Sequence, residues 1–285
     1  MGTRRTKINL AKHAGFCFGV KRAIKIAQEV AKSRYKIEML HEIVHNEKVV
    51  KDIEELGLKK VKRLRKGKNK ALLIQAHGMP RNIIKKAKDS DYKIIDATCP
   101  MVYEIHKTAI SMEKEGRKII IIGDKNHIEV KGIAGNIKSR PLIVESGKDI
   151  PLNKIKKIQK GAVVVQSTQN VQKVENIIKV LKKNIRDLKV FNTICAITRK
   201  KQREIQTMPL DNDIMIIVGS KKSANTKRLY EISRSLNKRT YWVESPKDLK
   251  KEWLKEASNI GVTSGASTPD YLTQNVIGRI KELTN

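Results

Sequence analysis

The chain has 285 residues, of which 39% are hydrophobic and 32% are charged, a composition typical of a folded protein rather than a disordered one. No apolar run approaches the roughly 18 residues that a membrane-spanning helix needs, so the sequence predicts no membrane association. The first residues lack the apolar stretch of an export signal. We therefore expect a cytoplasmic protein.

The charge balance is strongly basic, with 61 Lys and Arg against 29 Asp and Glu and a formal net charge of +32. Such a surface attracts polyanions, and nucleic acid is the first partner to consider. The basic residues are spread along the chain, however, and aromatic residues that could stack on bases make up only 4%. A solvated, lysine-rich surface is the favoured interpretation, with a basic RNA-binding or scaffold protein as the alternative.

Three cysteines divide the chain into similar stretches, each with the same order of predicted strands and helices. Before each cysteine the pattern predicts a strand, and after it a helix over 18–33, 100–116 and 196–208. A second strand then leads into a polar loop, at 36–44, 118–124 and 213–220. A third apolar strand follows, at 71–78, 161–168 and 259–268.

The spacing of the polar loops supports an internal repeat. The same interval of 28 residues separates Cys17 from His45, Cys99 from His127 and Cys195 from Ser223. Alternating strands and helices predict an α/β fold with small parallel sheets, whose strand ends face ligands. We expect three αβα domains, at 1–98, 99–193 and 194–285, related by a pseudo-threefold axis around a central cavity.

Cys17, Cys99 and Cys195 would meet in such a cavity, one from each repeat. Three thiolates can bind three irons of a [4Fe–4S] cluster, leaving the fourth iron open as a Lewis acid. A zinc site of three cysteines and one histidine is an intermediate possibility. The remaining possibility is that the three cysteines are inert core residues, but their equivalent positions in the repeats disfavour it.

Polar residues at the strand ends indicate an anionic ligand. Imidazoles and hydroxyls at helix starts suit a phosphate or diphosphate, and no nucleotide-binding GxxxxGK[ST] motif is present. The candidate ligands are His45, His77, His127, Ser223, Asn225 and Ser267. Glu129 is a candidate proton donor whose pKa we expect an anion and a reduced cluster to raise, with Ser167 or Thr168 relaying the proton.

The chain resembles the 4-hydroxy-3-methylbut-2-enyl diphosphate reductase family. The matching segments occur in the family's order and span nearly the whole chain: GFCFGVKRAI, HEIVHNEKVV, AHG at 76–78, DATCP, HIEV, NTICAITRKKQ, GSKKSANTKRL and GVTSGASTP. The resemblance implies a trefoil of three domains around an oxygen-sensitive [4Fe–4S] cluster. It also implies reductive removal of a hydroxyl from an allylic diphosphate, giving isopentenyl and dimethylallyl diphosphate at the end of the non-mevalonate pathway.

Roles for individual residues follow from the positions that match the family. Cluster ligation is implied for Cys17, Cys99 and Cys195. Diphosphate binding is implied for His45, His77, Ser223, Asn225 and Ser267. His127 matches a further substrate-pocket histidine, Glu129 the proton-relay carboxylate, and Ser167 the threonine that contacts the substrate hydroxyl.

Two positions depart from the family pattern. Ser167 keeps the hydroxyl of the usual threonine but lacks its methyl group, and Ala224 replaces a serine found in some members.

A ferredoxin- or flavodoxin-type protein is the expected electron donor. The alternative enzyme class is a [4Fe–4S] hydro-lyase acting on a small anionic substrate, which would need no external electrons.

Overall fold

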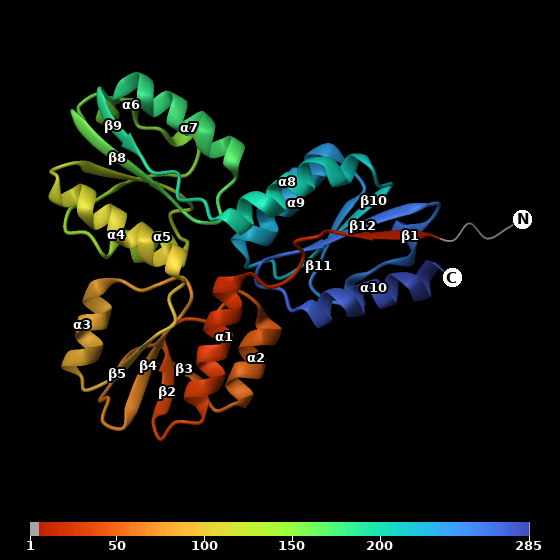
Figure 1. Ribbon diagram of the computed structural model, residues 1–285, viewed down its shortest axis with the longest axis horizontal. Helices are drawn as coiled ribbons and strands as arrows, with labels where there is room; N and C mark the ends of the chain where they lie inside the picture. Colours follow the sequence, from red (N-terminus) through yellow and green to blue (C-terminus); the bar gives the residue numbers. More distant parts are fainter. Residues whose placement is uncertain (1–5, 285) are drawn as a thin grey trace, which may run out of the picture. The chain divides into compact units, whose positions relative to one another are not determined.

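The computed structural model describes residues 6–284, which form an α/β fold with three four-stranded sheets (Figure 1). Every strand pairing in these sheets is parallel. The predicted α/β class with small parallel sheets is therefore confirmed. Within the described residues, no helix combines the length and apolar character needed to cross a membrane.

The first sheet has the strand order β3-β2-β4-β5. Its strands are β2 (Lys36–Met39), β3 (Lys59–Lys60), β4 (Lys70–Ile74) and β5 (Lys93–Asp96). The helices of this part of the chain are α1 (Phe18–Ala31), α2 (Glu47–Glu55) and α3 (Arg81–Asp89). Because α2 and α3 follow strands that step in opposite directions across the sheet, right-handed crossovers require them to cover opposite faces.

The second sheet repeats this order as β7-β6-β8-β9. Its strands are β6 (Lys118–Ile122), β7 (Leu142–Val144), β8 (Lys160–Val165) and β9 (Asp187–Val190). Its helices are α4 (Pro100–Lys114), α5 (Ile128–Ala134), α6 (Leu152–Ile155) and α7 (Val171–Asn184), with a 3-10 turn at Gly147–Asp149.

The third sheet has the order β1-β12-β10-β11. Its strands are β1 (Lys7–Leu10), β10 (Ile214–Val218), β11 (Thr240–Val243) and β12 (Asn259–Ser264). Its helices are α8 (Ala196–Thr207), α9 (Ala224–Leu236) and α10 (Asp270–Thr284), with 3-10 turns at Met208–Leu210, Pro246–Asp248 and Lys251–Leu254.

The strand before each cysteine lies at the edge of a sheet. Thus β5 and β9 close the first and second sheets, and β1 pairs in parallel with β12 in the third. The predicted first domain, 1–98, groups β1 with the first repeat by its place in the sequence. A four-residue strand has the same local pattern whichever sheet it joins, so only the long-range pairing assigns β1 to the third sheet. The three domain boundaries stay a prediction.

The described residues divide into two compact units. The one-sheet unit comprises residues 6–18, His45–Val49 and 196–284, and it contains the third sheet. The two-sheet unit comprises Gly19–Val44 and Val50–Cys195, and it contains the first and second sheets. Each unit carries part of the predicted site.

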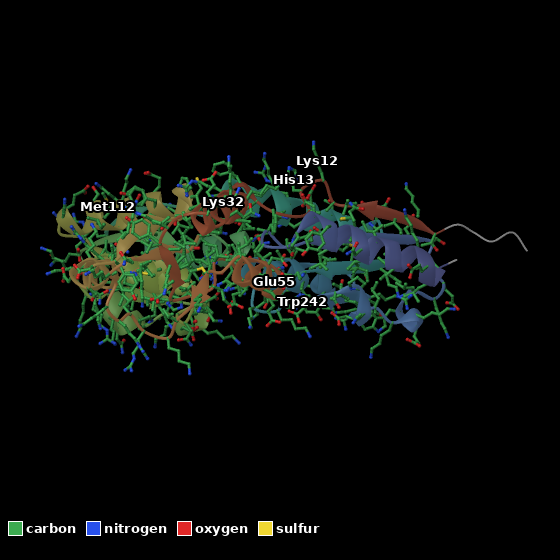
Figure 2. The ribbon with its side chains drawn as sticks, turned by 90° about the horizontal axis from the view of Figure 1, so that it is seen from below. Lys12, His13, Lys32, Glu55, Met112 and Trp242 are labelled. Atoms are coloured by element: carbon green, nitrogen blue, oxygen red, sulfur yellow. The ribbon has the colours of Figure 1, made fainter. Side chains whose placement is uncertain are left out.

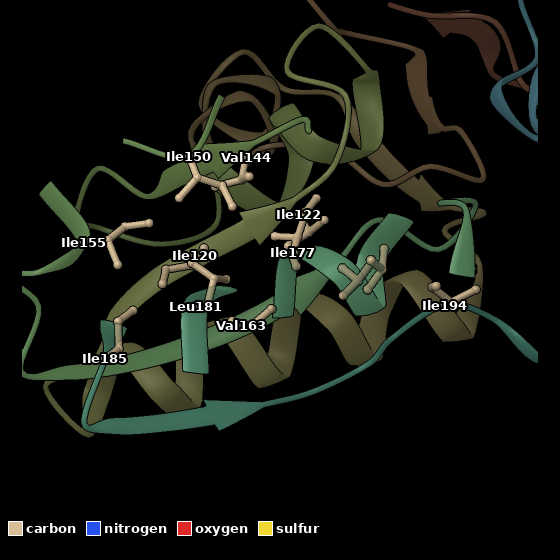
Figure 3. Close-up of a cluster of buried hydrophobic side chains, with 12 residues drawn as sticks. Ile120, Ile122, Val144, Ile150, Ile155, Val163, Ile177, Leu181, Ile185 and Ile194 are labelled. Carbon is tan, nitrogen blue, oxygen red and sulfur yellow. The ribbon is translucent and has the colours of Figure 1, made fainter. Parts of the chain in front are cut away.

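The central strands are buried on both faces, as their uninterrupted apolar sequences require. In β6, Ile120 and Ile122 point into a cluster that includes Leu181 of α7 (Figure 3). Ile119 and Ile121 of the same strand pack in a second cluster with residues of α4 and α5. Because side chains alternate along a strand, both helical layers are anchored to one strand, which gives rigid support to its loops.

The basic side chains lie almost entirely at the surface. Lys12 and Lys32, for example, are exposed, and Lys12 projects from the chain (Figure 2). Among the lysines and arginines of residues 6–284, only Lys201 and Arg228 are buried. This distribution agrees with the predicted solvated, lysine-rich surface.

Candidate functional site

The three cysteines occupy equivalent local structures. Each directly precedes or caps a long helix, and each backbone N–H donates to a carbonyl in the loop after a central strand. The hydrogen bonds, with N···O distances, are Cys17 to Ala266 (3.1 Å), Cys99 to Ala76 (2.9 Å) and Cys195 to Ser167 (3.0 Å). Each bond lies within one unit, so every cysteine is held beside a loop that carries predicted substrate-binding residues.

The cysteine positions suit anionic thiolate ligands. All three side chains are partly buried, and the helices that follow begin at Phe18, Pro100 and Ala196. Helix N-termini stabilise negative charge through the helix dipole. Cys17 belongs to the one-sheet unit, and Cys99 and Cys195 to the two-sheet unit. Convergence of the three thiols on one cluster stays a prediction.

The hydrogen bonds of the three cysteine N–H groups identify equivalent residues in the loops that accept them. Ser167 occupies the position of Ala76 and Ala266, because all three accept the cysteine N–H. The next residue in each loop is then His77, Thr168 or Ser267. By position, Thr168 is therefore the counterpart of two predicted diphosphate ligands.

Glu129 is the centre of a polar cluster in the two-sheet unit. It lies in the first turn of α5 and is fully buried. Its Oε1 accepts the backbone N–H of Ser167 at 2.6 Å, and its Oε2 accepts the Ser167 hydroxyl at 2.8 Å. The Nδ1 atom of His77 lies 3.9 Å from Oε2. A buried carboxylate with this many donors is held in one orientation.

His127 completes this cluster as the N-cap of α5. Its Nδ1 accepts the backbone N–H of Glu129 at 3.2 Å, which requires a lone pair on Nδ1. The other ring nitrogen, Nε2, then carries the proton that can be donated to a ligand. The rings of His77 and His127 meet edge to face with centroids 5.4 Å apart. The predicted grouping of His77, His127, Glu129 and Ser167 is present in this unit.

The protein groups around the Glu129 carboxyl lower its pKa. Burial raises this pKa, but hydrogen bonding with His77, electrostatic interactions with His127 and His77, and the Ser167 N–H outweigh burial. Our expectation of a raised pKa concerns Glu129 beside a bound anion and a reduced cluster, and it stays a prediction. In the surroundings that the protein supplies, Glu129 is ionised.

The one-sheet unit positions the predicted diphosphate ligands Ser223, Asn225 and Ser267, all buried. Ser223 caps α9, and its Oγ accepts the Thr226 N–H at 3.3 Å. The Ser267 hydroxyl donates to the backbone carbonyl of His45 at 3.0 Å. His45 and Ser267, far apart in sequence, therefore belong to one loop cluster.

Asn225 has the most informative surroundings of these residues. It is 3% exposed, and neither its amide nitrogen nor its carbonyl oxygen has a hydrogen-bond partner. Buried polar groups in native proteins are almost always paired, and an orphaned amide requires an explanation. A polar ligand that binds at the start of α9 would supply the missing partner.

Sequence reasoning missed two buried basic side chains, His106 and Lys201. His106 of α4 is buried and its pKa is lowered, mainly by burial and against the charges of Glu129 and Asp96. Its place on the apolar stripe of α4 was a usable signal, because polar residues on such a stripe are buried. Lys201 of α8 is also buried, but it lies in a run of basic residues that gives no such signal.

Known proteins resemble this chain along nearly its whole length. The family model described as LytB protein matches residues 8–281. The 4-hydroxy-3-methylbut-2-enyl diphosphate reductase of Aquifex aeolicus is 36% identical over 280 residues, covering 97% of this chain and 96% of the relative. The reductase of Campylobacter lari is 38% identical over 286 residues, covering 98% and 99%.

Solved structures give the same result. A structure of the terminal enzyme of the non-mevalonate pathway, (E)-4-hydroxy-3-methyl-but-2-enyl diphosphate reductase, matches with a TM-score of 0.72 and 35% identity, covering 97% of this chain and 99% of that one. The Plasmodium falciparum reductase matches with a TM-score of 0.88 and 31% identity, covering 96% and 87%. The predicted resemblance is confirmed, and the chain belongs to the LytB family of 4-hydroxy-3-methylbut-2-enyl diphosphate reductases.

Proposed function

We propose that this chain reduces 4-hydroxy-3-methylbut-2-enyl diphosphate to isopentenyl and dimethylallyl diphosphate, in the cytoplasm. The reaction removes the allylic hydroxyl as water and consumes two electrons and two protons. The observation that carries the proposal is Glu129, a fully buried carboxylate held by Ser167 and faced by two histidines. A carboxyl group placed in this way can transfer protons at a water-excluded site.

Cys17, Cys99 and Cys195 are the residues that would hold a [4Fe–4S] cluster. Their support is the shared local structure, a cysteine at a helix start whose N–H is tied to a strand-end loop. When bound, the cluster supplies the electrons and an open iron for the substrate hydroxyl. A ferredoxin- or flavodoxin-type donor would deliver those electrons. We also propose that the three domains surround a central cavity.

The diphosphate would be bound by the polar strand-end residues. Ser223, Asn225 and Ser267 surround the start of α9 and the loop after β12, and the orphaned Asn225 amide is the strongest support for a ligand there. Imidazole N–H groups of His45, His77 and His127 would supply further donors. Charge-assisted hydrogen bonds of this kind are stronger than neutral ones, which suits a ligand with several negative charges.

Glu129 and Ser167 would carry the proton to the leaving hydroxyl. The lowered pKa of Glu129 depends partly on electrostatic interactions with His127 and His77. A diphosphate bound to these imidazoles would place negative charge near the carboxylate, and the carboxyl would then hold a proton more readily. We infer that substrate binding itself prepares Glu129 to act as an acid, with the Ser167 hydroxyl between Glu129 and the substrate.

The decisive experiment replaces Glu129 with Gln in anaerobically prepared protein. Glutamine keeps the shape and can still accept the Ser167 N–H, but it cannot deliver a proton. Iron and sulfide content should be unchanged while turnover with a chemical electron donor falls by about 100-fold or more. Glu113→Gln is the matched control, because the Glu113 carboxylate also accepts two hydrogen bonds, from the backbone N–H groups of Lys138 and Ser139, but lies on the surface side of α4.

Full turnover in the Glu129→Gln variant would refute the acid role. Product formation from the hydroxylated diphosphate without any electron donor would instead favour the hydro-lyase alternative. Absence of iron after anaerobic purification would refute the reductase proposal.

A further inference from the structure

Lys201 is an unusual lysine in this chain because its side chain is almost completely buried, with 1% exposed. It lies in the second turn of α8, and its ammonium group donates to three backbone carbonyls. The acceptors are His13, Gly15 at 3.1 Å and Ser264 at 2.8 Å. An ammonium has three N–H donors, so this set of carbonyls matches its full capacity. Burying a charge is costly unless it is hydrogen-bonded in this way.

The three carbonyls come from two segments that lie at the carboxyl edge of the third sheet. His13 and Gly15 precede Cys17 by four and two residues, and Ser264 ends β12. Further hydrogen bonds join the same segments, from Gly15 N–H to the Ser264 hydroxyl at 2.6 Å and from Cys17 N–H to the loop after β12. Lys201 is therefore the point at which the cysteine-bearing segment, β12 and α8 are held together.

Glycine at position 15 is required by this arrangement. Its φ of +86° is in the left-handed region, and a Cβ there would lie 1.9 Å from the Asp270 carboxylate at the start of α10. The segment thus packs against α10 as well as α8. Its backbone is shaped to present carbonyls toward Lys201 rather than toward solvent.

A second contact with α8 comes one turn after Lys201. The Glu204 carboxylate accepts the His13 backbone N–H at 3.1 Å and lies 3.0 Å from the His13 ring nitrogen Nδ1. His13 is half-buried, whereas the neighbouring Lys12 points outward (Figure 2). Helix α8 therefore binds this segment in two ways. The Lys201 ammonium binds the backbone carbonyls of the segment, and the Glu204 carboxylate binds the His13 N–H.

We propose that Lys201 is a positioning residue that fixes the Cys17 segment, and hence the Cys17 thiol, for cluster binding. The inference rests on the proposed function only in treating Cys17 as a cluster ligand. A mobile Cys17 would bind iron with a larger entropic cost, and the buried ammonium removes that mobility before any cluster arrives. No other lysine in residues 6–284 is buried, which separates this role from the general basicity of the chain.

The test uses the full-length chain, prepared anaerobically without cluster, and the substitution Lys201→Met. Two quantities are measured: hydrogen–deuterium exchange of the amides from Gly15 to Cys17, and the rate at which iodoacetamide alkylates each cysteine, read by mass spectrometry. Both exchange in this segment and alkylation of Cys17 should accelerate about tenfold or more, because three hydrogen bonds to a charged group are lost. Alkylation of Cys99, which lies in the other unit, should not change.

Two further variants separate positioning from general stability. Lys200→Met removes an exposed lysine from the same helix and should leave both quantities at the wild-type level. Lys201→Arg keeps a buried cation with several donors and should restore most of the protection of Cys17. After reconstitution with iron and sulfide, Lys201→Met should bind less iron than Lys201→Arg.

The proposal is overturned if Cys17 reacts no faster in Lys201→Met, or if Cys99 accelerates equally. If that variant does not fold, hydrogen–deuterium exchange of the wild-type chain tests the proposal instead. Rapid, unprotected exchange at Gly15 and Cys17 in the wild type would show that the segment is not held. Should the segment be ordered as described while the reconstituted protein binds no iron, the proposed function fails and the positioning role stands.

Discussion

The Glu129 carboxylate accepts both hydrogen bonds that Ser167 can donate, one from the backbone N–H and one from the hydroxyl. These residues belong to different elements, α5 and the loop after β8. Ser167 also gives its carbonyl to the Cys195 N–H. One residue therefore links the candidate acid with a candidate cluster ligand through its own backbone.

Removing the Ser167 hydroxyl tests this link. In Ser167→Ala, the hydrogen bond to Oε2 is lost and the N–H bond to Oε1 remains, so the carboxylate should stay in place without its relay partner. A hydrogen bond to a charged group contributes about 1.5–3 kcal/mol, which corresponds to a fall in turnover of roughly 10- to 100-fold. Steady-state kinetics with a chemical donor measure this. Ser167→Thr keeps the hydroxyl and should retain activity, and a Thr variant as slow as Ala would contradict the relay.

The lowered pKa of Glu129 predicts how stability depends on pH. The folded-state pKa of Glu129 lies below the ordinary value of 4.5. The ionised carboxylate therefore stabilises the folded protein at pH values above about 4.5. This contribution is lost as the pH falls through the folded-state pKa. Thermal unfolding of wild type and Glu129→Gln from neutral to acidic pH should show a difference in Tm that shrinks below about pH 4.5. A difference that instead grows on acidification would mean that the pKa is raised.

Asn225 should contribute to ligand binding at a cost in stability. Replacing Asn225 with Ala removes a buried amide that has no partner within the protein. Unfolding stability should stay constant or rise by about 1 kcal/mol, while the Kd for inorganic diphosphate should rise by about tenfold.

Asn237 is the matched control for this substitution. Its amide donates to the backbone carbonyls of Pro209 and Asn212 at 3.1 and 2.7 Å, so it is structural. Asn237→Ala should lower stability and leave diphosphate affinity unchanged. If Asn225→Ala behaves like Asn237→Ala in both measurements, Asn225 is not a ligand.

The central strand of the second sheet should be sensitive to truncation. Ile120 is fully buried in the cluster of β6 and α7, so Ile120→Ala should lower the free energy of unfolding by about 2–5 kcal/mol through lost burial and the cavity left behind. Leu152 is 46% exposed, and Leu152→Ala should cost little. Denaturant unfolding of both variants checks this, and equal losses would contradict the packing described here.

The amino-acid sequence alone predicted the fold class, the internal repeat and the family of this protein. The periodicity of apolar residues predicted the α/β class, and the repeated cysteine spacing predicted three similar units. Both signals are local, because a strand or helix imposes its own period on the residues that form it. Segments such as GFCFGVKRAI and GVTSGASTP indicated the family, which the whole-chain comparisons confirm.

Only the tertiary structure decided which groups act on one another. β1 joined the last strand of the chain rather than its sequence neighbours. The pKa of Glu129 is lowered because His77 and His127 face it, and Lys201 binds a segment nearly 190 residues earlier in the chain. Such outcomes depend on long-range contacts and on burial, which set the electrostatic environment of a charged group and which no local pattern of residues encodes.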